Sequence, residues 1–168
     1  MRNDCEILVI GTGMTGLTAA VELAARDCSV LVIDKGRGVG GRLATRRIGE
    51  ATFDHGAQFV TARTPRFAGS VEAWCEKAAA REWCRGFGGD NNGHLRWRGQ
   101  PGMTGIAKHM AAELDVRMGQ TVLALRPVET GLQVDTKEGE IFQARAVVLT
   151  APVPQSLAML DAGGMVIG

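Results

Sequence analysis

The sequence has no tyrosine, few other aromatic residues and no cysteine motif. Three tryptophans and five phenylalanines are the only aromatic side chains among its 168 residues. The four cysteines form no Cys-x-x-Cys pair and show no zinc-type spacing with a histidine, which excludes a zinc motif. We therefore expect a protein without metal whose thiols are reduced and buried. A chain of this length buries enough surface to fold without such staples.

An excess of charge of one sign is also missing, as is any long apolar run. With 19 basic and 18 acidic residues, the formal net charge is +1, so no global field attracts nucleic acid or an anionic membrane. The apolar run that precedes the first glycine, Ile7–Ile10, is too short for a signal peptide or a membrane span. These absences predict a cytoplasmic protein whose partner is a small, neutral molecule, with no nucleic-acid or membrane partner. They leave its oligomeric state open.

The first 34 residues read as a strand, a helix and a second strand. CEILVI (Cys5–Ile10) is short, apolar and rich in β-branched residues, as expected for a strand buried on both faces. Met14–Arg26 follows with apolar residues at helical spacing, and SVLVID (Ser29–Asp34) predicts a second buried strand. The pattern predicts an α/β fold of the Rossmann type with a parallel sheet.

A glycine motif lies at the turn from the first strand to the helix. Gly11, Gly13 and Gly16 form GxGxxG, which provides a tight turn, close approach of a pyrophosphate and close helix–strand packing, in that order. The helix N-terminus then faces the phosphates with free N–H groups. Asp34 closes the second strand, where a carboxylate can accept hydrogen bonds from an adenosine ribose. The conjunction predicts dinucleotide binding, although a solvated acid at a strand end is the alternative for Asp34.

A second cluster of glycines and arginines, KGRGVGGRLATRR, follows Asp34 directly. An NAD domain would usually continue into another helix here, so the cluster disfavours a plain NAD(P)-dependent dehydrogenase. It contains an RxxGGRxxS/T signature, and with it the chain resembles the FAD-dependent amine-oxidase-like and desaturase-like flavoproteins. The residues that carry this signature are Arg37, Gly40, Gly41, Arg42 and Thr45.

Three further segments are similar to the renalase branch of that superfamily, in order and at similar spacing. They are FDHGAQFVTAR (53–63), RWRGQPGMTGIAKHM (96–110) and AVVLTAPVPQ (146–155). The resemblance implies a Rossmann-like FAD-binding domain with a β-meander crossover and a partial substrate-domain insertion. The implied parts are 1–63 and 114–168 for the FAD-binding domain and 64–113 for the substrate or lid insertion.

The resemblance also implies a set of cofactor-binding residues. FAD would lie against the glycine turn, the ribose acid and its neighbour, the glycine–arginine doublet, a stretch along the isoalloxazine, and a backbone contact to adenine. In that order they are Gly11, Gly13, Met14, Thr15 and Gly16; Asp34 and Lys35; Gly40, Gly41 and Arg42; Gly56, Ala57, Gln58 and Phe59; and Val122. The Arg42 guanidinium can pair with a pyrophosphate bidentately. An ordinary core valine is the alternative for Val122.

Substrate-binding residues follow from the same resemblance, but no catalytic side chain does. Phe59, Thr61 and Arg63 resemble the segment that lines the substrate side, and Trp97 could stack on a ring. Core packing is the alternative for Trp97, and a surface position is the alternative for Arg63. Hydride transfer is the chemistry of the cofactor, so no protein acid or base is required.

The middle and the end of the chain predict further helices and strands. Thr64 and Pro65 are a good helix start, and apolar residues at helical spacing predict an amphipathic helix over 65–80. Residues 85–103 predict a hairpin or loop around an Asn-Asn-Gly turn over the active site, and 104–114 a helix. DVRM (115–118) predicts a third parallel strand, 121–126, 131–136 and 140–143 a meander, and 146–150 a fourth parallel strand.

Two functions of different class are compatible with these features. The first is a renalase-like FAD-dependent oxidoreductase that takes hydride from a small substrate, of dihydronicotinamide type or an amine, and passes electrons to oxygen with peroxide release. The second is a non-catalytic, truncated dinucleotide-binding fragment, because relatives continue for well over a hundred residues beyond Gly168. Relatives also usually carry glycine where this chain has Asp27, and a left-handed conformation there would cost about 1 kcal/mol.

Overall fold

The computed structural model describes residues 4–87 and 93–165 and divides the chain into two compact units. Unit 1 comprises Met1–Val39 and Glu113–Gly168, and unit 2 comprises Gly40–Ala112. The second division lies one residue from the boundary expected after residue 113. The first comes at Gly40 rather than after residue 63, because the segment after Gly40 hydrogen-bonds within unit 2, as described below. Each unit is described by itself.

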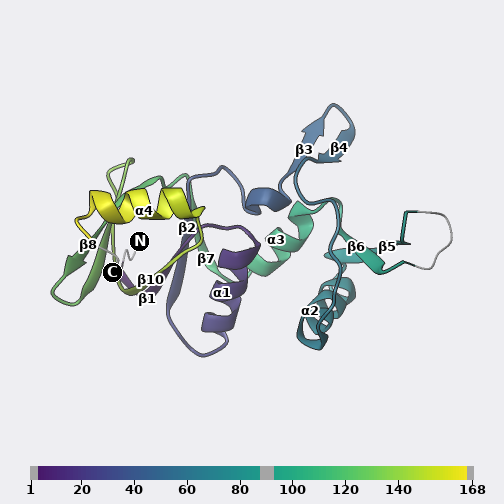
Figure 1. The fold of residues 1–168 in the computed structure, drawn as a ribbon, viewed down its shortest axis with the longest axis horizontal. Helices are drawn as coiled ribbons and strands as arrows, with labels where there is room; N and C mark the ends of the chain where they lie inside the picture. Colours follow the sequence, from purple (N-terminus) through teal and green to yellow (C-terminus); the bar gives the residue numbers. More distant parts are fainter. Residues whose placement is uncertain (1–3, 88–92, 166–168) are drawn as a thin grey trace. The chain divides into compact units, whose positions relative to one another are not determined.

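Unit 1 is built on a six-stranded sheet with the order β7-β2-β1-β10-β9-β8 (Figure 1). The strands are β1 (Asp4–Ile10), β2 (Val30–Asp34), β7 (Asp115–Met118), β8 (Val122–Val128), β9 (Gly131–Thr136) and β10 (Ile141–Leu149). β7, β2, β1 and β10 are parallel, whereas β9 and β8 continue the sheet in antiparallel fashion. The predicted α/β fold with a mostly parallel sheet is confirmed.

Helices cover both faces of this sheet, which explains why β1 is apolar over Ile7–Ile10 and β2 over Val30–Ile33. Leu8 and Ile33 belong to the buried cluster on the face where α4 (Val153–Ala162) contributes Met159 and Leu160. Val9 and Val32 alternate to the other face, where they pack with Ala20 of α1 (Met14–Ala24). α4 is not among the elements expected from sequence, and two prolines, Pro152 and Pro154, lie at its start, where proline is tolerated.

The last two predicted strands, 140–143 and 146–150, are one continuous strand in the structure. β10 pairs antiparallel with β9 through Ile141–Ala144 and runs parallel to β1 from Gln143 to Leu149. Pro127 lies inside β8, opposite Leu132. β8 is the edge strand of the sheet, where a residue without an N–H group is tolerated.

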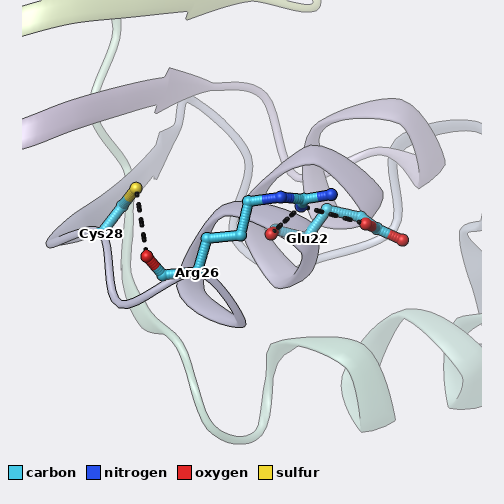
Figure 2. A network of polar contacts seen from close by, with 3 residues as sticks. All are labelled: Glu22, Arg26 and Cys28. Atoms are coloured by element: carbon cyan, nitrogen blue, oxygen red, sulfur yellow. Dashed lines mark hydrogen bonds and ion pairs between the residues drawn. The ribbon is translucent and has the colours of Figure 1, made fainter.

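The link between α1 and β2 contains a residue in a left-handed conformation. Asp27 has φ 60°, and its N–H donates to the carbonyl of Ala24 at 3.0 Å. Figure 2 shows its neighbours: the Arg26 guanidinium donates to the carbonyl and the carboxylate of Glu22, and the Cys28 thiol lies near the Arg26 carbonyl. No contact in the described part of the chain holds the Asp27 side chain, which is exposed. The φ of Asp27 confirms the left-handed conformation considered for this position.

The described residues of unit 2 form two small antiparallel ribbons and two helices. Its elements are the 3₁₀ turn η1 (Gly41–Leu43), β3 (Thr45–Ile48), β4 (Ala51–Asp54), α2 (Pro65–Glu76), β5 (Ala80–Arg85), β6 (Leu95–Gly99) and α3 (Thr104–Ala111). β3 pairs with β4, and β5 pairs with β6 as the predicted hairpin. The expected turn residues Asn91 and Asn92 lie outside the described residues. α2 begins as predicted, with the Thr64 hydroxyl accepting from the N–H of Phe67, but it ends before residue 80 because Ala78 has φ 55°.

A polar network joins the β3–β4 ribbon to the start of α3. The Thr45 hydroxyl donates to the Asp54 carboxylate at 2.5 Å and accepts from the N–H of Thr104 at 3.0 Å. The same carboxylate accepts from the N–H of Met103 at 2.9 Å, so an acid lies at the positive end of α3. The Thr104 hydroxyl in turn donates to the carbonyl of Leu43 at 3.0 Å. This network places the glycine–arginine segment in unit 2.

Two properties of the whole described chain bear on the expectations from sequence. The four cysteines are free, and each is half-buried rather than fully buried. Burial raises the pKa of the Cys5 and Cys75 thiols. Among residues 4–87 and 93–165, no helix combines the length and the apolar character needed to cross a bilayer.

The left-handed residue between α1 and β2 leads to a prediction about stability. Asp27→Gly should raise the free energy of unfolding by about 0.5 to 1 kcal/mol, because glycine adopts a positive φ without the steric cost of a Cβ atom. Urea denaturation followed by circular dichroism measures the change. Asp27→Ala is the matched control, since it removes the carboxylate but keeps the Cβ atom, and it should bring no gain. Equal stability of Asp27→Gly and the parent would contradict the prediction.

Candidate functional site

The three glycines of the β1–α1 turn meet three different steric demands. A Cβ atom on Gly16 would lie 1.9 Å from the carbonyl oxygen of Gly11, so α1 packs on the end of β1 at backbone distance. A Cβ atom on Gly11, which has φ 116°, would lie 2.3 Å from the Thr150 hydroxyl. Around Gly13 nothing lies within 4 Å of that position. The first and third glycines are thus fixed by packing, whereas the second faces open space at the helix N-terminus.

The start of α1 carries no capping side chain. Gly13 is the N-cap residue and makes no side-chain hydrogen bond, and the first turn of the helix contains no acidic residue. The positive end of the helix dipole and its first N–H groups are therefore open to an anion beside Gly13. Met14 and Thr15, the other predicted contacts in this turn, are partly buried and exposed, respectively.

The carboxylate of Asp34 is anchored by backbone and side-chain donors of unit 1. One oxygen accepts from the N–H of Thr12 at 2.7 Å and from its hydroxyl at 2.8 Å, and the other accepts from the N–H of Gly36 at 2.7 Å. Thr12 is fully buried. A carboxylate offers about four acceptor positions, so these three bonds leave about one, on the oxygen that binds Gly36. Asp34 thus organises the turn and retains capacity for one further donor, while Lys35 beside it is exposed.

The segment that follows β7 lies against the end of β2, next to Asp34. The N–H of Gln120 donates to the carbonyl of Asp34 at 2.9 Å, and the N–H of Gly119 donates to that of Gly36 at 3.0 Å. Val122 comes two residues later, at an irregularity in the β8–β9 pairing, and is partly buried against the core. The structure therefore brings Val122's segment to the strand ends that carry Asp34 and the glycine turn.

Gln120 is a residue that the sequence did not single out. Its side-chain oxygen is buried and has no hydrogen-bond partner in the described part of the chain. Buried polar atoms are nearly always paired, so a buried acceptor without a donor calls for an explanation such as a ligand. No local motif marks this residue, because its position depends on a contact between β2 and the segment after β7.

The predicted residues of unit 2 form a second group. The N–H of Ala57 donates to the carbonyl of Arg42 at 2.8 Å, and a Cβ atom on Gly56 would lie 2.0 Å from that same oxygen. Gly40, which has φ 121°, and Gly41 form the turn before Arg42. The structure therefore brings the glycine–arginine doublet and the Gly56–Ala57 stretch together. The Arg42 side chain is exposed, and no described residue pairs with it.

The predicted substrate residues lie beside the β5–β6 hairpin. Val60 and Trp97 exchange backbone hydrogen bonds of 2.9 and 3.0 Å, which attaches the Phe59–Thr61 segment to the edge of β6. Phe59 is half-buried and contacts the rings of Trp83 and Phe87. Thr61 and Trp97 are partly buried, whereas Gln58 and Arg63 are exposed. Ring stacking by Trp97 stays a prediction.

Comparisons with known proteins address the family directly. Residues 9–76 match the NAD(P)-binding Rossmann-like domain, and residues 63–162 match the flavin containing amine oxidoreductase family. The chain belongs to the flavin-containing amine oxidoreductases. FAD as the cofactor and an FAD-dependent oxidoreductase as the enzyme class are therefore confirmed at the level of the family.

The chain is also similar to individual proteins, one in sequence and one in fold. Over 54 residues, 32% of the chain, it is 43% identical to 4,4'-diapophytoene desaturase (4,4'-diaponeurosporene-forming) of Staphylococcus haemolyticus, and it covers 11% of that protein. Its fold is similar to that of putrescine oxidase, both in a triple mutant redesigned in cofactor binding (TM-score 0.76) and in the wild type bound to putrescine (TM-score 0.75). Both are 16% identical to it, and it covers 60% of those chains with 94% of its own.

The geometry of unit 1 fits the adenosine diphosphate half of FAD on three observations. The space beside Gly13 is open at an uncapped helix N-terminus, where a pyrophosphate can meet the backbone. Asp34 is oriented by its neighbours and keeps an acceptor position for a ribose hydroxyl. Gln120 supplies a buried acceptor at the same edge of the sheet.

The contrast between the second and third glycines gives a paired prediction. Gly13→Ala should fold with a loss below about 1 kcal/mol, because φ is −73° and the Cβ atom meets no neighbour, yet ADP affinity should fall about tenfold or more. Gly16→Ala should lose about 3 kcal/mol of stability, because its Cβ atom would overlap the Gly11 carbonyl. Thermal denaturation and calorimetric titration with ADP measure both effects. An unchanged ADP affinity in Gly13→Ala would exclude the pyrophosphate position.

The unpaired acceptor of Gln120 gives a second prediction about the nucleotide. Gln120→Met keeps the size of the side chain but removes the buried acceptor, so the stability of the ligand-free protein should stay equal or rise. ADP affinity should fall about threefold to tenfold, the loss expected for one hydrogen bond. Gln143→Met makes the same substitution at an exposed position on β10 and should change neither quantity. A Gln120→Met protein that is clearly less stable and binds ADP normally would show a purely structural role.

Proposed function

We propose that this chain is the FAD-binding part of an oxidoreductase of the renalase-like branch. In this proposal a small substrate, of dihydronicotinamide type or an amine, gives up hydride, and oxygen takes the electrons and leaves as hydrogen peroxide. Because the chain spans 60% of the putrescine oxidase chains, the activity of the whole protein is part of the proposal. A cytoplasmic location and a single small-molecule substrate are expectations that accompany it.

The observation that carries the proposal is the build of the β1–α1 turn. Packing fixes two of its glycines, the remaining one faces open space at the positive end of a helix, and an oriented carboxylate stands at the end of the neighbouring strand. A turn that served only to connect a strand and a helix would not need Gly13 to be bare. The arrangement suits a ligand that presents a diphosphate to the helix and a ribose to the acid.

Each unit, taken by itself, carries residues that the resemblance assigns to FAD. Gly13 and the first N–H groups of α1 would bind the pyrophosphate, Asp34 a ribose hydroxyl, and the Val122 segment the adenine. In unit 2, Arg42 would offer its guanidinium to the pyrophosphate, and the small residues Gly56 and Ala57 would lie along the flat ring. When bound, FAD would accept hydride from the substrate, so the protein's own task is to bind, orient and exclude water.

The narrower assignment to the renalase-like branch is supported by sequence segments rather than by a catalytic side chain. The stretches 53–63, 96–110 and 146–155 carry the similarity to that branch. The first two contain the Phe59–Thr61 segment and β6, which the Val60–Trp97 bridge joins. This local arrangement fits a substrate-side wall made of two segments that are far apart in the chain.

Flavin content and peroxide release test the proposal together. The purified chain should be yellow and keep its flavin absorbance through gel filtration, and it should consume a dihydronicotinamide with release of one hydrogen peroxide per hydride. Gly13→Ala is the matched control, since it should fold but lose flavin. A colourless protein that binds only ADP would favour the non-catalytic dinucleotide-binding alternative. A yellow protein that is silent with dihydronicotinamides and active with amines would exclude the renalase-like substrate.

A further inference from the structure

One face of the β5–β6 hairpin gathers positive charge. Arg81 of β5 lies directly opposite Arg98 of β6, and Cys84 lies opposite Arg96. Because side chains alternate between the faces of a strand and opposite residues share a face, the three arginines lie on the same face. Arg85 lies opposite Leu95 and belongs to the other face.

No carboxylate neutralises these arginines in the part of the chain that the structure describes. Among residues 4–87 and 93–165, no ion pair involves Arg81, Arg96 or Arg98. A terminal nitrogen of Arg96 donates to the His94 carbonyl at 3.4 Å, and the Nε atoms of Arg96 and Arg98 are buried without a hydrogen-bond partner. Like charges directly opposite one another destabilise a ribbon, so the Arg81–Arg98 pair works against the hairpin. An arrangement that reduces stability is typical of a binding site, where a ligand supplies the missing partner.

Aromatic rings surround the guanidinium of Arg96. Its central carbon lies 4.1 Å from the ring centre of Phe87 and 5.1 Å from that of Phe59, both within cation–π range. Phe59, Trp83 and Phe87 contact one another with ring centres 5.7 to 6.1 Å apart. Phe87 is 67% exposed and Trp83 43% exposed, so two of the three rings offer free surface. We call these three rings with Arg81, Arg96 and Arg98 the arginine–aromatic face.

The sign of the charge decides which ligand this face can take. Aromatic rings bind ammonium groups, but here Arg96 already occupies the faces of two rings. Within the described residues of the hairpin, a protonated amine would meet three arginines and no carboxylate on this face, since Glu82 is opposite Trp97 on the other side. An anion would instead find forked donors that fit phosphate oxygens, and exposed rings on which a base or a nicotinamide can stack.

We propose that the arginine–aromatic face binds a phosphate-bearing aromatic ligand, namely a mononucleotide or the nucleotide portion of a larger molecule. The arginines hold the phosphate, and the exposed ring of Trp83 stacks on the aromatic ring of the ligand. All of its residues belong to unit 2.

The connection of this face to the redox reaction rests on the proposed function. If the chain is the oxidoreductase proposed above, the face favours an anionic, phosphate-bearing substrate and disfavours cationic amines such as putrescine. Phe59 supports the connection, because it belongs both to this face and to the segment expected on the substrate side. The binding of the nucleotide itself requires neither flavin nor turnover.

Equilibrium binding of reduced nicotinamide mononucleotide tests the proposal without any activity measurement. This probe lacks adenosine, so it does not depend on the ribose acid of unit 1. Its binding should quench tryptophan fluorescence, because Trp83 lies in the face, and should weaken as salt is added. Arg98→Gln and Arg81→Gln should each reduce the affinity about tenfold or more, the effect of losing one charged hydrogen bond. Their thermal stability should stay equal or rise, because each removes the repulsion between the two arginines.

Matched variants separate the phosphate contact from general effects of charge and folding. Arg85→Gln removes the same charge from the other face of the hairpin and should leave the affinity within about twofold. Arg96→Lys keeps the charge but loses the planar fork, and should weaken binding while the fold is retained. Putrescine should neither bind to this face nor displace the probe.

The outcomes of this experiment distinguish failure of the site from failure of the proposed function. Absence of binding, or equal losses in Arg98→Gln and Arg85→Gln, would overturn the site, as would competition by putrescine. A single-stranded oligonucleotide that bound far more tightly through the same arginines would overturn the assignment to a small ligand. A colourless protein that still bound the probe through Arg98 would contradict the proposed function alone, and a yellow protein without this dependence would contradict the site alone.

Discussion

The backbone contact between α1 and the end of β1 is the constraint on which unit 1 depends. With no Cβ atom on Gly16, the helix starts directly against the carbonyl of Gly11, while the Thr150 hydroxyl donates to the carbonyl of Ile10 at 2.8 Å. β1, α1 and the end of β10 therefore meet at one point. This closeness leaves the helix N-terminus at the carboxyl edge of the sheet, where parallel α/β proteins bind their ligands. Asp34 is held at the same edge by Thr12, so turn and acid are ordered as one piece.

Local signals in the sequence were sufficient for most of the fold. Apolar runs, glycine spacing and the Thr64–Pro65 start predicted β1, α1, β2, β7 and α2 because each depends on residues close in the chain. The errors arise where contacts between residues far apart in the sequence determine the secondary structure. β10 is one strand because β9 and β1 flank its two halves, and Pro127 stays in a strand because β8 has a free edge. The helix α4 was missed because proline is compatible both with the end of a strand and with the first turn of a helix.

Some residues of the candidate site could be predicted from local motifs, whereas others are brought there only by contacts between distant segments. GxGxxG, Asp34 and the glycine–arginine doublet form motifs, and the geometry around Gly13 and Gly56 gives each bare backbone position a physical reason. Gln120 has no motif, since only its backbone bond to Asp34 brings it to this edge. The arginines of β5 and β6 are likewise ordinary in the sequence. Their register alone shows that three of them share a face, on which the described residues of the hairpin place no acid.

The charge of the whole chain conceals this local excess. The net charge of +1 favoured a neutral partner in the sequence analysis. Net charge describes the whole molecule, however, and charges farther apart than a Debye length are screened from one another, so it does not report the charge of a single hairpin. The acids are used elsewhere: Asp34 and Asp54 accept backbone N–H groups, and Asp135 binds Arg126 and Gln133, which lowers the pKa of its carboxyl. Acids committed to structure cannot neutralise arginines on another ribbon. A balanced composition therefore coexists with a face that needs an anion, and only the register of two strands reveals it.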